Sequence, residues 1–161
     1  MPASETRRTY EAEFLVRDML DTGHADLHGR RFDFGVERRF ASLENVQDYV
    51  QRVLNLNWLR AAYPAAANPL RVVRSRVINK ASCGSGILNM NNSFAGKWQM
   101  RELVLLHEIA HHLTPYEAHT AAFRTCFAHL VEEIMSPEAA LALRTGWWDL
   151  GLAVHPAPSM A

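Results

Sequence analysis

The stretch Arg101 to Leu113 reads RELVLLHEIAHHL and decides the fold. It has no Gly, no Pro and no cluster of β-branched residues, so it predicts a helix. Positions i and i+4 of a helix lie on the same face, so His107 and His111 point the same way. Two such imidazoles can bind one divalent metal ion, and Glu108 beside them can take a proton from metal-bound water. This HExxH pattern predicts metal-dependent hydrolysis.

Chance is a weak explanation of the HExxH match, although the chain has eight histidines. A shuffled chain of this composition would contain about 0.03 such matches. The rest of the helix is almost wholly apolar, and the polar residues Glu108, His111 and His112 would be costly to bury without partners. We therefore favour a metal site over histidines that are satisfied within an ordinary core.

A third ligand is expected a short way downstream. Thr114-Pro115-Tyr116-Glu117 predicts a helix start, with Thr as N-cap, Pro at the first helical position and Glu in a capping box. The helix would run to about Met135 with an apolar stripe of Phe123, Phe127, Leu130, Val131 and Ile134. His119 begins this stripe, so it should face His107 and His111. Competing third ligands are His112, Glu117 and His129.

Zinc is the metal that this ligand set favours. Three protein ligands with an open fourth position are typical of a catalytic zinc site, whereas structural sites usually have four ligands and are rich in Cys. Imidazole ligands also suit Fe, Ni or Cu, so the choice of zinc depends on the HExxH pattern.

Length and composition predict one domain over residues 1–154, followed by a flexible tail over residues 155–161. Lys plus Arg and Asp plus Glu number 17 each, so no net charge favours nucleic acid or an anionic membrane. The cluster of Arg30, Arg31, Arg38 and Arg39 is interpreted as a solvated surface. The oligomeric state is left open.

The expected location is the cytoplasm. Cys83 and Cys126 are far apart and in no CxxC arrangement, so both are interpreted as free thiols in a reducing compartment. The N-terminus lacks the apolar stretch of a signal peptide, and no segment approaches 18 apolar residues.

The remaining segments predict an α+β fold, with a small mixed or antiparallel sheet packed against the HExxH helix and the ligand-bearing helix after it. A first helix is expected over Glu5 to Thr22, with Ser4 as its cap, Gly23 as its stop and a packing face of Tyr10, Phe14, Leu15, Val16, Met19 and Leu20. A second helix should begin after its cap Ser42, with Val46, Tyr49, Val50, Val53 and Leu54 on one face, and a further helical turn is expected over Trp58 to Tyr63. The last helix should run from Ser136 to about Arg144, with Gly146 near its stop and with Trp147 and Trp148 over the core.

Three strands are expected, at Arg31 to Val36, Leu70 to Ile78 and Ile87 to Met90. Ala65 to Pro69 is interpreted as a linker and Ala81 to Gly86 as a turn-rich segment. Ile87 to Met90 either pairs with an extended peptide by edge addition or is an ordinary sheet strand.

With these residues placed, the chain resembles zincin-class metallohydrolases, and within them a family of small metallohydrolases of actinobacteria and their phages with a SprT-like layout. The matching stretches are ERRFASLENVQDYVQRVL, RELVLLHEIAHHL, AHTAAF and SPEAALALR, which together span most of the chain. The resemblance implies one zincin-like domain, with His107, His111 and His119 as metal ligands and Glu108 as the catalytic base. Thr120 departs from the family pattern, where Gly is expected after the third His.

The leading hypothesis is a zinc metallopeptidase that acts on a peptide or protein, in which Glu108 activates the water and then protonates the leaving amine. Tyr116 either stabilises an oxyanion or packs at the helix corner. The alternatives are an ImmA-like regulatory protease or antirepressor partner that acts beside a transcriptional regulator, a SprT-like role near DNA, and a structural metal site without catalysis. ImmA-like proteins usually have a carboxylate as their third metal ligand. A role near DNA needs a basic surface, and a structural metal site needs a fourth protein ligand.

Overall fold

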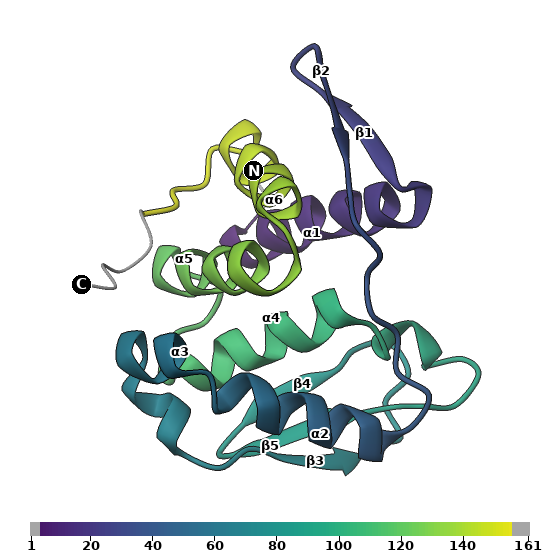
Figure 1. The fold of residues 1–161 in the computed structure, drawn as a ribbon, viewed down its shortest axis with the longest axis vertical. Coiled ribbons are helices and arrows are strands. Elements are labelled where there is room, and N and C mark those ends of the chain that lie inside the picture. The colour runs from purple at the N-terminus through teal and green to yellow at the C-terminus, as the bar shows by residue number, and fades with distance from the viewer. Residues whose placement is uncertain (1–3, 156–161) are drawn as a thin grey trace. The chain divides into compact units, whose positions relative to one another are not determined.

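The computed structural model describes residues 4–155 (Figure 1), and these form two compact units. One unit comprises residues 4–37 and 117–155, and the other comprises residues 38–116. Across the described residues there are six α-helices, a two-stranded sheet and a three-stranded sheet, so the α+β class is confirmed. One domain over residues 1–154 stays a prediction. Of the predicted tail, residues 156–161 lie outside the described residues.

The unit of residues 38–116 holds the HExxH helix, α4. Its elements are α2 Leu43–Leu54, α3 Asn57–Ala62, the short 3-10 helix η1 Pro64–Ala67, β3 Arg71–Arg74, β4 Ser82–Gly84, β5 Ile87–Met90, the 3-10 turn η2 Lys97–Gln99 and α4 Glu102–Leu113. The sheet order is β3-β5-β4, with β3 parallel and β4 antiparallel to β5. In this unit α2 packs on β3, α4 packs on β4, and the two helices contact each other.

The α2 helix forms as its sequence predicts. The Ser42 hydroxyl accepts a hydrogen bond from the Asn45 N–H at 3.1 Å, which satisfies one of the N–H groups that a helix start leaves without a partner. The five apolar residues of the predicted face, Val46, Tyr49, Val50, Val53 and Leu54, are all buried. This face contacts β3 and α4.

β5 lies in the middle of its sheet, so it is an ordinary strand and the edge-addition alternative for Ile87–Met90 is wrong. Both of its edges are already paired, one with β3 and one with β4. β4 falls within the segment that was predicted to be only a turn, and the strand predicted over Leu70 to Ile78 is confined to Arg71–Arg74. The predicted linker from Ala65 begins inside η1.

The other unit contains α1 Glu5–Thr22, β1 His24–Leu27, β2 Arg30–Asp33, α5 Ala121–Leu130, the π-helical turn η3 Val131–Met135 and α6 Pro137–Asp149. The α1 bounds, its Ser4 N-cap and its Gly23 stop at φ +93° confirm the prediction. The Ser136 cap of α6 is confirmed as well, since its hydroxyl accepts from the Ala139 N–H at 3.1 Å. None of the helices within residues 4–155 is long and apolar enough to cross a membrane.

The strand predicted over Arg31 to Val36 is wrong in extent. β2 ends at Asp33 and pairs with β1 in an antiparallel hairpin, whose turn residues His28 and Gly29 have φ values of +49° and +79°. Two consecutive residues with positive φ suit the right-handed twist of a tight hairpin. Val36 lies beyond the strand and is fully exposed.

The predicted core face of α1 is confirmed at Val16 but wrong at Phe14 and Leu15, and the predicted stop of α6 is also wrong. Phe14 and Leu15 are half exposed, while the buried face of α1 consists of Thr9, Ala12, Glu13 and Val16. α6 continues through Gly146 to Asp149, and a Cβ atom built at Gly146 would lie 3.1 Å from the Ala12 Cβ. Small residues therefore let the two helices approach closely.

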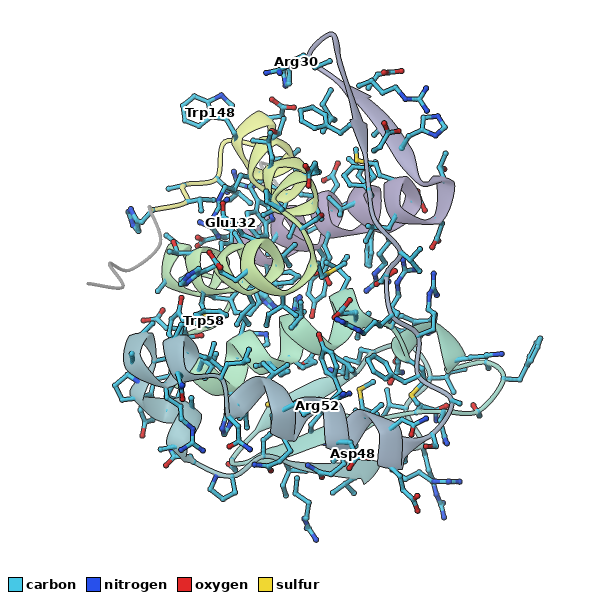
Figure 2. The ribbon with its side chains drawn as sticks, in the orientation of Figure 1. Arg30, Asp48, Arg52, Trp58, Glu132 and Trp148 are labelled. Carbon is cyan, nitrogen blue, oxygen red and sulfur yellow. The ribbon has the colours of Figure 1, made fainter. Side chains whose placement is uncertain are left out.

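The two tryptophans near the end of α6 lie in different environments. Trp147 is fully buried and its indole N–H donates to the Thr9 carbonyl oxygen at 3.2 Å, so the expectation that it covers the core is confirmed. Trp148 is 79 % exposed and points away from the helices, as Figure 2 shows, so the same expectation is wrong for Trp148.

The close approach of α1 and α6 predicts that Gly146→Val lowers the free energy of unfolding by about 1 to 3 kcal/mol, because an overpacked helix contact must open. Urea unfolding followed by circular dichroism measures the change. Gly35→Val is the control, because a Cβ at Gly35 meets no atom within 4 Å. A Gly146→Val chain as stable as the control would contradict this account of the contact.

Candidate metal centre

The predicted helix over Arg101 to Leu113 is confirmed as α4, Glu102–Leu113. Residues 102–110 are all buried, as is Leu113, so the helix is enclosed around almost its whole circumference. A helix that is apolar all round is stable only inside a core. Its polar side chains therefore stand out, since each must find a partner or carry a function.

The start of α4 is fixed by a buried carboxylate. Glu102 accepts hydrogen bonds from the Tyr49 hydroxyl at 2.5 Å and from Arg38 Nη1 at 2.9 Å, and its own N–H donates to the Arg38 carbonyl oxygen at 3.0 Å. Burial and the Glu102 charge raise the pKa of Tyr49 well above its ordinary value, so the hydroxyl keeps its proton. A negative charge in the first turn also interacts favourably with the helix dipole and so stabilises the helix.

These contacts were missed by the sequence interpretation, which placed Tyr49 on an apolar face and Arg38 in a solvated cluster. The signal available was an acid at the first turn of an otherwise apolar helix, since a buried carboxylate needs donors. The sequence gives no means of finding which donors they are, because Arg38 and Tyr49 are 64 and 53 residues away from Glu102.

His107 and His111 lie on one face of α4, as their spacing predicts. Their ring centroids are 5.1 Å apart and the ring planes make an angle of 64°. His107 is 1 % exposed, whereas His111 is half-buried. Two imidazoles at this separation, one of them open toward solvent, fit the donor chemistry of a divalent metal ion.

Glu108 lies beside the histidine pair and is only 4 % exposed. Its Oε1 atom is 4.0 Å from His107 Nε2. A carboxylate at this distance is placed to exchange a proton with a molecule bound at the histidines, by a small side-chain adjustment. The predicted neighbours His107, Glu108 and His111 are thus brought together within one unit.

Cys83 on β4 is a neighbour of this group that the sequence did not identify. Burial, and to a smaller extent the negative charge of Glu108, raise the pKa of its thiol to about 12. The thiol is therefore protonated at neutral pH, which makes it a poor nucleophile. As predicted, neither Cys83 nor Cys126 forms a disulfide.

His119 belongs to the unit of residues 4–37 and 117–155, and it lies in a loop rather than on a helix. The predicted helix start at Thr114 is wrong, because α5 begins at Ala121 with Thr120 at the N-cap position. Thr120 has φ −83°, so no glycine is required there. In its own unit the His119 ring contacts Phe123, with centroids 5.0 Å apart. Its role as third ligand stays a prediction.

The competing third ligands have other contacts. His112 Nε2 lies 2.9 Å from the Asn68 carbonyl oxygen, and the Glu117 carboxylate accepts from the Thr120 hydroxyl at 2.6 Å. His129 is buried in α5, and burial lowers its pKa. Tyr116 is fully exposed with φ +75°, so the expectation that it packs at the helix corner is wrong.

The buried carboxylate contact predicts that Tyr49→Phe lowers the free energy of unfolding by about 1.5 to 3 kcal/mol, because it removes a hydrogen bond to a charged group. Urea unfolding measures the loss. Tyr116→Phe is the matched control, since Tyr116 is fully exposed. Equal stability of the two variants would show that the Tyr49 hydroxyl does not hold Glu102.

No protein-family model, curated protein or solved structure matches the chain. Membership of the zincin class and of the small metallohydrolase family therefore stays a prediction.

Proposed function

We propose that this protein is a zinc-dependent hydrolase that cleaves peptide bonds, with the metal ion held by His107, His111 and His119. One observation carries the proposal. His107 and His111 share one face of a buried helix, and the carboxylate of Glu108 lies beside them. Burial of an acid and an imidazole in an otherwise apolar helix is costly for stability, and this cost is typical of functional sites.

His119 is proposed as the third ligand because its tether to α4 is short. It follows Leu113, the last residue of α4, by six positions. Six residues span at most about 20 Å even when fully extended, and a chain that turns covers much less. A histidine on so short a connection stays within reach of the last turn of α4, where His111 lies.

Each proposed residue has a distinct task. The three imidazoles, in their neutral form, would hold the ion, a ligand set typical of catalytic rather than structural zinc sites. Zinc bound there supplies a Lewis acid that polarises a carbonyl and lowers the pKa of water to about 7. Glu108 accepts the proton of the attacking water and passes it to the amine that leaves.

The edge of the three-stranded sheet supports the proposal that the substrate is a peptide. β4 is an edge strand, and it packs on α4. An exposed sheet edge binds an extended peptide through main-chain hydrogen bonds. A peptide added along Ser82–Gly84 would therefore pass beside the helix that carries Glu108.

The ligand set predicts that the purified chain binds about one zinc ion, and that His107→Ala, His111→Ala and His119→Ala each abolish stoichiometric binding. Elemental analysis after dialysis against zinc measures the metal content. His112→Ala is the matched control, because this neighbouring histidine contacts the Asn68 carbonyl instead. Full zinc content in the His119→Ala chain would remove that residue from the site.

The role of Glu108 predicts that Glu108→Gln keeps the zinc and reduces hydrolysis of fluorescein-labelled casein by about 100-fold or more, because the amide cannot accept the proton. Glu44→Gln, at an exposed position of α2, should hydrolyse casein at the wild-type rate. Undiminished hydrolysis by the zinc-loaded Glu108→Gln protein would refute Glu108 as the base.

A further inference from the structure

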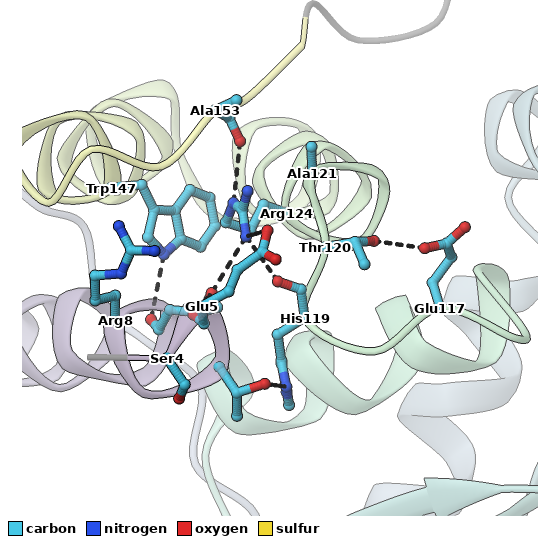
Figure 3. A network of polar contacts seen from close by, with 12 residues as sticks. Ser4, Glu5, Arg8, Glu117, His119, Thr120, Ala121, Arg124, Trp147 and Ala153 are labelled. Carbon is cyan, nitrogen blue, oxygen red and sulfur yellow. Dashed lines mark hydrogen bonds and ion pairs between the residues drawn. The ribbon is translucent and has the colours of Figure 1, made fainter. Parts of the chain in front are cut away.

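The main chain and the ring of His119 are both held by side chains of its own unit. Its carbonyl oxygen accepts a hydrogen bond from Arg124 Nη1 at 2.6 Å, as Figure 3 shows, and its Nδ1 atom lies 3.3 Å from the Thr6 hydroxyl oxygen. Thr6 belongs to α1, whereas Arg124 lies in the first turn of α5. Two helices far apart in sequence thus meet at one loop histidine.

Arg124 is itself rigidly placed. Its side chain is among the most deeply buried of the unit, at 1 % exposure. Nη1 also donates to the Glu5 carboxylate at 2.8 Å and lies 3.4 Å from the Thr9 hydroxyl, and Nε donates to the Ala153 carbonyl at 3.0 Å. A planar guanidinium that donates hydrogen bonds in several directions cannot shift without breaking several of these hydrogen bonds. The carbonyl of His119 is therefore pinned.

The His119 ring is confined by two aromatic rings as well as at Nδ1. The Tyr10 ring lies 4.8 Å away, centroid to centroid, and is inclined at 58°, while the Phe123 ring lies 5.0 Å away at 84°. Rotation of the imidazole would break the Thr6 contact and would press against these two rings. The orientation of His119 is thus set by packing within this unit.

The Thr6 contact also bears on which ring nitrogen can bind a metal ion. A histidine that ligates a metal through one nitrogen usually donates its other N–H to an oxygen, and that second contact fixes both the tautomer and the ring orientation. A threonine hydroxyl can accept such a hydrogen bond. The tautomer in which Nδ1–H donates to Thr6 leaves the lone pair of the ring on Nε2.

We propose that Thr6 and Arg124 are positioning residues for the metal ligand His119. Arg124 fixes its main chain, and Thr6 holds the hydrogen on Nδ1 so that Nε2 is presented to the ion. This inference rests on the proposed function for the presence of the metal. It adds that α1, which carries none of the proposed ligands, tunes the affinity of the site.

The test compares Thr6→Val, which keeps the shape but removes the hydroxyl, with Thr6→Ser, which keeps the hydroxyl. Thr6 is exposed, so both chains are expected to fold. Thr22→Val, an exposed position near the far end of α1, is the matched control. The ¹⁵N chemical shifts of the His119 ring in the metal-free full chain report the tautomer, and competition with a chromophoric chelator gives the Kd for zinc.

Thr6→Val should reduce the share of the Nδ1–H tautomer and weaken zinc binding about tenfold, whereas Thr6→Ser and Thr22→Val should match the wild type. Arg124→Lys should also weaken zinc binding, because a lysine ammonium cannot reproduce the forked contacts. If zinc binding requires His119 but the Thr6→Val protein has the wild-type tautomer and Kd, this inference is overturned while the proposed function stands. If the wild-type chain binds no zinc, the proposed function fails, and the inference fails with it.

Discussion

The enclosure of α4 is the constraint on which the unit of residues 38–116 depends. A helix buried around its circumference needs apolar side chains on every face, yet α4 carries Glu102, His107 and Glu108 among its buried residues. Each buried polar group costs free energy unless it is paired. Glu102 is paired with Tyr49 and Arg38, and this pairing serves the fold by fixing where the helix starts. His107 and Glu108, more than one turn further along α4, are the buried polar residues on which the proposed metal site depends.

The unit of residues 4–37 and 117–155 solves a similar problem with a cation. Arg124 is buried in the first turn of α5, and its donors go to α1, to the loop before α5 and to the segment after α6. Helices α1 and α6 of this unit approach each other closely at Ala12 and Gly146, where a larger side chain at Gly146 would have no room. The apolar residues Phe14 and Leu15 of α1, in contrast, are half exposed. Polar anchoring and small-residue packing thus determine the position of the His119 loop within the unit.

The sequence predicted those parts of the fold that local chemistry specifies. The bounds of α1 and α2 follow from serine caps and from apolar spacing, and α4 follows from a mainly apolar run without Gly or Pro. The pair His107 and His111 follows from helical periodicity alone. By contrast β1, β4 and the true core of α1 depend on neighbours that are distant in sequence, and strands of three or four residues have almost no periodicity to detect.

The predicted start of α5 at Thr114 is wrong because contacts with the preceding helix override the local sequence signal. Thr114-Pro115-Tyr116-Glu117 has the residue types of a capping box, but the N–H and the hydroxyl of Thr114 both donate to the Ala110 carbonyl oxygen, at 3.0 and 2.7 Å. Thr114 therefore ends α4 and cannot begin the next helix. The left-handed Tyr116 then turns the chain, and the helix start is delayed to Thr120. His119 consequently lies in a loop, where Thr6 and Arg124 can hold it in ways that no helical pattern predicts.

The most direct test of the central claim is X-ray absorption at the zinc edge of the metal-loaded protein, because it reports the type and number of ligand atoms without any substrate. The account predicts three imidazole ligands at about 2.0 to 2.1 Å with one further light atom, and no sulfur. A zinc–sulfur distance near 2.3 Å, or a sphere closed by four protein ligands, would contradict it.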